Sequence, residues 1–210
     1  MTLGDLGYKE LTQNPTEWSL YLEWIKEINP RSYLEIGAYW GFSLQGVARV
    51  LQPDSWLTVV EAPTHARAWE KLLEIMDETT KEVPHIRIDL IKGSSRESRV
   101  LDRVENKGYF DICFIDASHD FSSVWSDFEN YGKWSTFTVV HDIDERLIEK
   151  NKWKHNGVEN ATAAHFWKCL KRFRPEVIVK EFIDPLAFET PMGIGIFRTE
   201  GWLWKRGANR

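Results

Sequence analysis

The stretch that decides the fold of this chain is Arg31-Ser-Tyr-Leu-Glu-Ile-Gly-Ala-Tyr-Trp-Gly-Phe-Ser43. It reads as a short apolar strand, then a turn that contains two glycines, then the start of a helix. Glycine after a strand lets the backbone turn sharply and lets a ligand approach without a Cβ in the way. The helix that follows directs its N-terminal N–H groups and the positive end of its dipole toward the same turn. We therefore expect a ligand at this turn, the simpler alternative being a glycine turn that binds nothing.

Glu35, the acidic residue in this stretch, limits the kinds of ligand that the turn could bind. Dinucleotide pyrophosphate loops favour more glycine and no acid at this place, and phosphate loops favour glycine followed by lysine and a hydroxyl residue. The pattern here is Glu35-x-Gly37-x-x-x-Gly41. It favours a ligand with a cationic end that resembles an amino acid.

Length and composition predict one globular domain in the cytoplasm. The chain has 210 residues, of which 42% are hydrophobic, enough for one good core. No apolar run approaches the roughly 18 residues of a membrane span, and the N-terminus lacks a basic and then apolar signal region. Cys113 and Cys169 both lie in apolar patterns, so we expect two reduced core residues.

The charge and the aromatic content of the chain indicate which kinds of partner it could bind. The net charge is −5, with mixed signs along the chain, which argues against dedicated nucleic-acid binding. The 11 tryptophans are many for this length. They suggest aromatic walls around a pocket that binds a small molecule, or an interface, which leaves a homo-oligomer open.

Strands and helices alternate through the middle of the chain. Asn14 and Pro15 begin a helix that ends at Asn29-Pro30. After the opening strand, further strands are expected at Trp56–Glu61, Ile86–Ile91, Tyr109–Asp116 and Phe137–His141, separated by helices at Ala66–Thr79, Ser95–Lys107 and Ser122–Tyr131. Continuously apolar strands separated by helices predict a mostly parallel sheet with helices on both faces.

The last third of the chain predicts how the sheet closes. We expect, in order, a polar loop, a helix, a strand, a long hairpin connection and a final strand at Asp144–Gly157, Val158–Phe173, Glu176–Ile183, Asp184–Gly193 and Ile194–Arg198. A hairpin makes the final strand antiparallel. The prediction is a seven-stranded sheet in the order 3-2-1-4-5-7-6. The chain would divide into an arm and cap helix over residues 1–30, one α/β domain over 31–198, and a tail over 199–210.

Acids gather where the predicted strands end. In an open α/β sheet, ligands bind beyond the carboxyl ends of the strands. Those ends carry Glu35, Glu61, Asp116 and His141-Asp142. Packing does not account for them, because each carboxylate needs solvent or a partner. Glu61 ends the second strand, the usual place for an acid that binds a ribose diol, the alternative being a solvated strand end.

Three stretches resemble a known family. They are Leu34–Ser43, Val59–Glu61 and Phe110-Asp-Ile-Cys-Phe-Ile-Asp-Ala-Ser-His-Asp-Phe121. Together they are similar to the class I S-adenosylmethionine-dependent methyltransferases, which have a Rossmann-like fold. The third stretch resembles the "IDxxH" strand end of a subgroup that includes macrolide sugar and antibiotic O-methyltransferases. The resemblance covers roughly residues 30–198.

The resemblance implies which residues hold S-adenosylmethionine. Its methionine part would lie against Glu35, Gly37, Gly41 and Ser43, its ribose against Glu61, and its adenine near Ser94 and Ser95, with Asp116 also in contact. Two departures stand out. Ser94 occupies a position where the family often has Asp, and Gly132-Lys-Trp-Ser135 replaces the usual Gly-Gly before the fifth strand.

The resemblance also raises a metal site. Catechol-type O-methyltransferases bind a divalent cation at positions that correspond here to Asp116, His141 and Asp142. Mg²⁺ prefers oxygen ligands, so His141 departs from that pattern. It could be a ligand to a softer metal, a group that supports the ligands, or no ligand at all. Asp116 and Asp142 are the better candidates.

His119 is the predicted catalytic base, acting beside Asp116. An imidazole titrates near neutrality and can accept the proton of a substrate hydroxyl. The predicted activity is therefore O-methylation of a small sugar-like or aromatic molecule. One alternative is a non-catalytic protein with the same fold. Another is a metal-dependent oxygenase or hydrolase that uses Asp116, His119 and His141.

Substrate contacts are only broadly indicated. Five residues from the expected surrounding segments could form an aromatic wall: Trp40, Trp134, Trp153, Phe188 and Met192. Core packing explains each of them equally well. His165, which lies between apolar residues of a helix, is expected to pack rather than to act.

Overall fold

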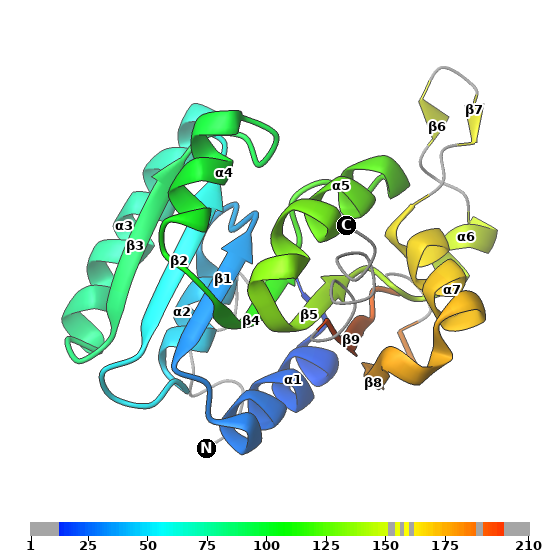
Figure 1. The fold of residues 1–210 in the computed structure, drawn as a ribbon, viewed down its shortest axis with the longest axis horizontal. Helices are drawn as coiled ribbons and strands as arrows, with labels where there is room; N and C mark the ends of the chain where they lie inside the picture. Colours follow the sequence, from blue (N-terminus) through cyan, green and yellow to red (C-terminus); the bar gives the residue numbers. More distant parts are fainter. Residues whose placement is uncertain (1–12, 151–153, 156–157, 160–161, 188–190, 200–210) are drawn as a thin grey trace, which may run out of the picture.

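One seven-stranded sheet forms the centre of the computed structural model, which describes residues 13–150, 154–155, 158–159, 162–187 and 191–199 (Figure 1). Its strand order is β3-β2-β1-β4-β5-β9-β8, with β9 antiparallel to both of its neighbours. The strands are β1 Ser32–Ile36, β2 Trp56–Glu61, β3 Arg87–Lys92, β4 Phe110–Ile115, β5 Ser135–His141, β8 Ile178–Phe182 and β9 Ile194–Arg198. Counted within the sheet, this is the order 3-2-1-4-5-7-6, so the predicted topology is confirmed.

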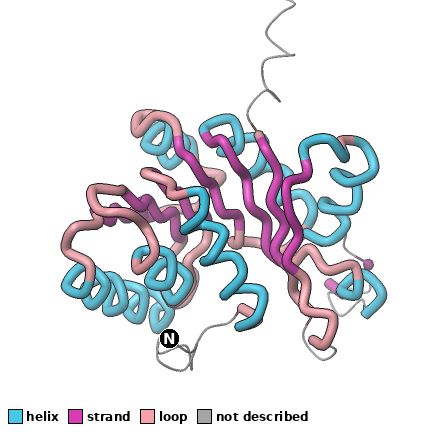
Figure 2. The backbone as a smooth tube through the Cα atoms, turned by 90° about the horizontal axis from the view of Figure 1, so that it is seen from below, coloured by secondary structure: helices cyan, strands magenta, loops and turns pink. Residues whose placement is uncertain are grey.

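Helices cover both faces of this sheet (Figures 1 and 2). One face packs against α1 Pro15–Ile28, α2 Phe42–Ala48 and α3 Ala66–Glu82, and the other against α4 Ser98–Glu105, α5 Phe121–Tyr131 and α7 Ala163–Phe173. Successive strand residues alternate between the two cores: Tyr33 belongs to the first, and Leu34 to the second. Two buried faces explain why the strands are apolar without interruption.

Helix α1 is an integral part of the first core. Asn14 caps it, because its Oδ1 accepts hydrogen bonds from the N–H groups of Thr16 and Glu17 at 2.9 and 3.2 Å. The rings of Trp18 and Tyr21 lie 5.9 and 5.5 Å from that of Phe114 on β4. The segment expected to form an arm and cap therefore carries, from residue 15 onward, a helix that packs directly on the sheet.

The region after β5 differs from prediction. The expected loop Asp144–Gly157 contains α6 Arg146–Lys150 and strand β6 Lys154–His155, which pairs with β7 Val158–Glu159. The helix expected to begin at Val158 therefore begins only at Ala163. Its start is fixed by a capping box in which the N–H of Thr162 donates to Nδ1 of His165 at 3.0 Å.

Several smaller expectations also need correction. The helix expected over Ser95–Lys107 is shorter, spanning Ser98–Glu105. Cys113 is buried as predicted, but Cys169 is exposed. The inward face of α7 is formed by Phe166, Trp167 and Leu170, which leaves Cys169 on the outer side. Short 3₁₀ turns lie at Gly132–Trp134 and Pro175–Val177.

Within the described ranges, no helix combines the length and the apolar character needed to cross a membrane.

Candidate active site

The turn after β1 needs glycine for two different packing reasons. Gly37 has φ +89°, and a Cβ there would lie 2.4 Å from Cα of Ala117, which follows β4. Gly41 has φ +87°, and a Cβ there would lie 2.9 Å from Cδ1 of Leu72 on α3. Both values of φ favour glycine. The neighbours that exclude a side chain are therefore parts of this chain, whereas the sequence argument assigned that role to a ligand.

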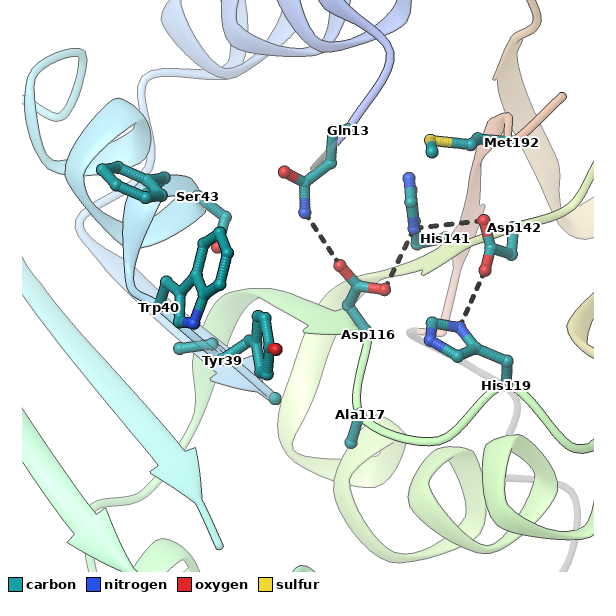
Figure 3. A pocket seen from close by; sticks show the side chains of 13 residues that line it. Gln13, Tyr39, Trp40, Ser43, Asp116, Ala117, His119, His141, Asp142 and Met192 are labelled. Carbon is teal, nitrogen blue, oxygen red and sulfur yellow. Dashed lines mark hydrogen bonds and ion pairs between the residues drawn. The ribbon is translucent and has the colours of Figure 1, made fainter. Parts of the chain in front are cut away.

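Two adjoining cavities open beyond the carboxyl ends of the strands. The first, here called the histidine cavity, has a volume of about 330 Å³ and includes Trp40, Ser43, His119, His141, Asp142 and Met192 in its lining (Figure 3). The second, here called the serine cavity, has a volume of about 390 Å³ and includes Glu61, Ser94, Ser95, Arg96, Ser123 and Asp127. Both are lined by Gly37, Tyr39, Asp116 and Ala117, so one ligand could extend across both.

Glu61 fixes the turn that separates the cavities. Its Oε2 accepts hydrogen bonds from the N–H groups of Ala38 and Tyr39 at 2.7 and 2.8 Å. Tyr39 has φ +49°, which is uncommon for a residue with a side chain. Its ring stacks on Trp40 with centroids 5.0 Å apart. Oε1 of Glu61 makes no hydrogen bond within the described part of the chain, so it can accept one from a ligand in the serine cavity.

Glu35 lies behind the cavity wall. It is fully buried and accepts a hydrogen bond from the Ser43 hydroxyl at 2.5 Å. Burial raises its pKa to about 8, although the Ser43 hydrogen bond acts in the opposite direction. Ser43 lines the histidine cavity, while Glu35 lines neither cavity. A ligand would therefore meet Glu35 through Ser43.

Four titratable side chains form a chain of contacts in the histidine cavity (Figure 3). Nδ1 of His141 lies 3.0 Å from Oδ1 of Asp116 and 3.4 Å from Oδ1 of Asp142. Nδ1 of His119 lies 2.8 Å from Oδ2 of Asp142. The second oxygen of Asp116 accepts a hydrogen bond from the Gln13 amide at 3.0 Å. The strand ends of β4 and β5 thus bring all four predicted residues together.

Their surroundings give these groups different charges. Burial alone would lower the pKa of His141, but the adjacent carboxylates of Asp116 and Asp142 raise it to about 9. The hydrogen bond with Asp142 raises the pKa of His119. Burial alone would raise the pKa of Asp142, but His141 and His119 hold it below its usual value. The arrangement is therefore an imidazolium between two carboxylates, with a second imidazole at its outer end.

This arrangement does not fit a divalent cation. A cation bound here would need the oxygens of Asp116 and Asp142, and those oxygens accept from the Nδ1 atoms of the two histidines and from Gln13. The ring of His141 lies between the two carboxylates, with Nδ1 at 3.0 Å from Asp116 and 3.4 Å from Asp142. Among the residues that the structure describes, no group of three side chains is arranged to hold a metal ion. The same hydrogen bonds count against an iron site built from Asp116, His119 and His141.

Some of the other predicted residues also lie at the two cavities, and others do not. Ser94 and Ser95 line the serine cavity, and Trp40 and Met192 line the histidine cavity. Trp134 packs against the second core instead. Trp153 and Phe188 lie outside the described residues.

The lining residues that sequence reasoning missed include Gln13, Tyr39 and Asp127. No sequence pattern marks Gln13 or Tyr39 as a site residue, because packing between distant parts of the chain places them at the cavity. A pattern does mark Asp127, because it is an acid on the apolar stripe formed by Val124, Phe128 and Tyr131.

Comparisons with known proteins place the chain among methyltransferases. A family model described as a methyltransferase domain matches residues 34–143. No curated protein sequence matches the chain.

Three solved structures share its fold. An O-methyltransferase from Bacillus cereus in complex with SAH has 18% sequence identity and a TM-score of 0.68, over 93% of this chain and 86% of that one. The O-methyltransferase TomG from Streptomyces achromogenes, involved in tomaymycin synthesis and in complex with SAM, has 17% identity and a TM-score of 0.66, over 93% and 88%. SAH-bound PaMTH1, a methyltransferase from Podospora anserina, has 16% identity and a TM-score of 0.58, over 93% and 85%.

Proposed function

Because this chain belongs to the methyltransferase-domain family, whose model matches residues 34–143, we propose that it transfers a methyl group from S-adenosylmethionine to a hydroxyl group of a small molecule. The observation that carries the proposal is the hydrogen bond between His119 and Asp142 in a cavity that adjoins a second, ligand-sized cavity at Asp116.

The residues around the two cavities fit the cofactor. Oε1 of Glu61 is an acceptor for ribose hydroxyls, and Ser94 and Ser95 line the same cavity. Gly37 and Ser43, with Glu35 behind Ser43, line the other side of the junction. When bound, S-adenosylmethionine supplies an electrophilic methyl group on a sulfonium. Asp116 belongs to both cavities, so it lies where cofactor and substrate would meet.

His119 has the geometry of a general base. Its Nδ1 faces Asp142, which assigns the proton of the neutral ring to Nδ1 and makes Nε2 the atom that accepts the substrate proton. The carboxylate orients the ring and stabilises the imidazolium that forms. Asp142 itself has φ +60°, an uncommon backbone conformation for a side-chain-bearing residue. Tyr39 and Trp40 supply an aromatic surface for the acceptor.

No step of this proposal uses a metal ion. Asp116 and Asp142 interact with histidine side chains, so the base and the two aromatic residues carry the substrate side of the reaction. We expect positioning of the hydroxyl beside the methyl donor to contribute much of the acceleration. The divalent cation expected from the sequence is therefore not part of this proposal.

The direct test is transfer of an isotopically labelled methyl group from S-adenosylmethionine to a panel of sugars, phenols and other hydroxylated molecules. We expect His119→Ala to retain cofactor binding and to lose about 10²–10⁴-fold in rate, the usual contribution of a general base. His119→Gln should not restore activity, since an amide cannot take the proton. Excess EDTA should leave the wild-type rate unchanged.

Other outcomes would identify the alternatives. Cofactor binding without transfer to any acceptor would indicate a non-catalytic binding protein. A rate that requires iron and ignores S-adenosylmethionine would indicate an oxygenase. Full activity of His119→Ala would remove His119 from the mechanism.

A further inference from the structure

One part of the sheet has no helix over it among the described residues. Helix α4 covers the carboxyl ends of β2 and β3, where its valines pack with Val60 and Ile91. This helix of 8 residues is about 12 Å long, whereas two strands of 6 residues each span about 20 Å. The N-terminal halves of β2 and β3 are therefore left open on the face that α4 covers (Figure 1).

A third cavity, here called the tryptophan cavity, lies on this open part of the sheet. Its volume is about 260 Å³, and its lining consists of Trp56, Thr58, Arg87, Asp89 and Lys107. In the register of the two strands, Trp56 pairs with Arg87 and Thr58 with Asp89, so the four share one face. None of these five residues lines the histidine cavity or the serine cavity. The tryptophan cavity is therefore separate from the proposed methyl-transfer site.

The charges around the tryptophan cavity do not cancel. Lys107, which follows α4, donates to Oδ2 of Asp89, so these two residues neutralise each other as an ion pair. The side chain of Arg87 is exposed and makes no hydrogen bond or ion pair with the part of the chain that the structure describes. One positive charge is therefore left over, on a planar group that can donate two parallel hydrogen bonds to a carboxylate.

Trp56 lies beside this positive charge. It is the register partner of Arg87, and neighbouring strands lie about 4.8 Å apart. Its side chain is 38% exposed, whereas Thr58, two residues further along the same face of β2, is 1% exposed and forms the floor of the cavity. An exposed indole offers a flat apolar surface on which another ring can pack. The cavity thus presents an aromatic surface and an unpaired guanidinium side by side.

This pairing matches a ligand that carries a ring and one negative charge close together. The volume is below the range of about 300–1,000 Å³ that is usual for ligand pockets, so the ligand is small. A doubly charged phosphate fits less well, because the carboxylate of Asp89 belongs to the same wall. We propose that the tryptophan cavity binds a small aromatic carboxylate, whose ring packs on Trp56 and whose carboxylate accepts hydrogen bonds from Arg87. The inference does not depend on the proposed methyl transfer.

The test is a titration of the isotopically labelled protein, followed by NMR of its indole N–H groups. The signal of Trp56 is the one that is missing from the spectrum of Trp56→Leu. We expect indole-3-acetate to shift this signal with a dissociation constant of about 1 mM or lower. Indole-3-acetamide, the uncharged analogue, should bind about 10-fold more weakly, because it offers no charge to the guanidinium. Saturating S-adenosylhomocysteine should leave the titration unchanged.

Two arginine variants separate the proposed contact from a general effect of charge. Arg87→Gln should bind indole-3-acetate about 10-fold more weakly than the wild type and bind the amide equally well. Arg67→Gln is the matched control, since it removes the same charge from the exposed side of α3 on the other face of the sheet, and it should keep the wild-type preference.

Four results would overturn the assignment. They are no shift of the Trp56 signal at about ten times the expected dissociation constant, equal affinity of the wild type for the acid and the amide, an undiminished preference in a folded Arg87→Gln protein, and displacement of indole-3-acetate by S-adenosylhomocysteine. The last result would place the compound in the methyl-transfer site instead.

Discussion

Glu35 and Asp142 show how differently one fold treats two carboxyl groups. Both lie at strand ends of the same sheet. Burial raises the pKa of Glu35 to about 8, and its one protein partner is the neutral hydroxyl of Ser43. Asp142 has two histidine neighbours, which lower its pKa in spite of burial. At neutral pH the first is mostly protonated and supports the cavity wall, while the second is an anion that can orient His119.

The raised pKa of Glu35 predicts a pH-dependent stability. In the unfolded chain this carboxyl ionises at its ordinary value of 4.5, whereas in the folded chain it holds its proton to about 8. Its contribution is therefore fully present below pH 4.5 and is lost as the pH rises toward 8, at about 1.4 kcal/mol for each unit of pKa difference. We expect Glu35→Gln to flatten the decline in unfolding free energy over this window.

Urea unfolding at about pH 5 and about pH 8 measures that decline, since it reports the free energy at each pH directly. Glu23→Gln, on the exposed side of α1, is the control and should keep the wild-type slope. A Glu35→Gln protein with the same pH dependence as the wild type would show that Glu35 is ionised in the folded state.

The partnership of His119 with Asp142 predicts a pH–rate profile. A base must be deprotonated to act, so the rate should rise with pH through the pKa of His119, which its hydrogen bond to Asp142 raises. Asp142→Asn removes that effect. We expect its rising limb at lower pH than in the wild type, together with a fall in maximal rate of about 10²-fold or more through loss of ring orientation. A lower rate with an unshifted limb would argue that the two residues are not coupled.

At the scale of elements, α1 holds the connection that follows β8. Glu17 on α1 is buried, and its two oxygens accept hydrogen bonds from the backbone N–H groups of Asp184 and Gly193 at 2.7 and 2.8 Å. Asn14, which caps α1, donates to the side chain of Asp184 at 3.2 Å. The connection carries Met192, which lines the histidine cavity. Helix α1, which precedes the sheet in the chain, thus positions the connection after β8 and with it Met192 in the wall of the histidine cavity.

Glu17→Gln is expected to weaken this attachment. The amide nitrogen of glutamine cannot accept, so at least one buried N–H group loses its partner, at a cost of about 1–3 kcal/mol in unfolding free energy. Urea unfolding checks this, with Glu23→Gln again as the control on the same helix. A cost no greater than that of the control would show that the connection does not depend on Glu17.

Elements were predictable where one periodicity dominated. Continuously apolar runs bounded by polar residues located the central strands to within a few residues. The predicted start of the helix at Val158 was wrong. The apolar residues of this segment suit a helix, but pairing between β6 and β7 places Val158 and Glu159 in a strand. The prediction that Cys169 is buried was wrong, because apolar neighbours in the sequence do not show which side of a helix faces the core. In the first case strand pairing outweighed the local sequence pattern, and in the second case the orientation of the helix on the sheet did.

At the scale of the whole molecule, the strand order assembles the site. Parallel strands β1, β2, β3, β4 and β5 end at one edge of the sheet, which is why residues from Glu35 to Asp142 could be assigned to one place from sequence. Their individual partners could not. Gln13 reaches Asp116 across 103 residues, and Asp127 reaches the serine cavity only because α5 packs against the segment after β3. Contacts of that range depend on packing that a single sequence does not display.

The central claim is that the two adjoining cavities bind one S-adenosyl ligand, and the melting temperature with and without millimolar S-adenosylhomocysteine tests it most directly. A ligand that binds only the folded protein stabilises it by mass action. We predict a rise of several degrees for the wild type and a smaller rise for Glu61→Ala, which loses the expected ribose acceptor and the hydrogen bonds that fix Ala38 and Tyr39. No rise in the wild type at saturating ligand would contradict the account.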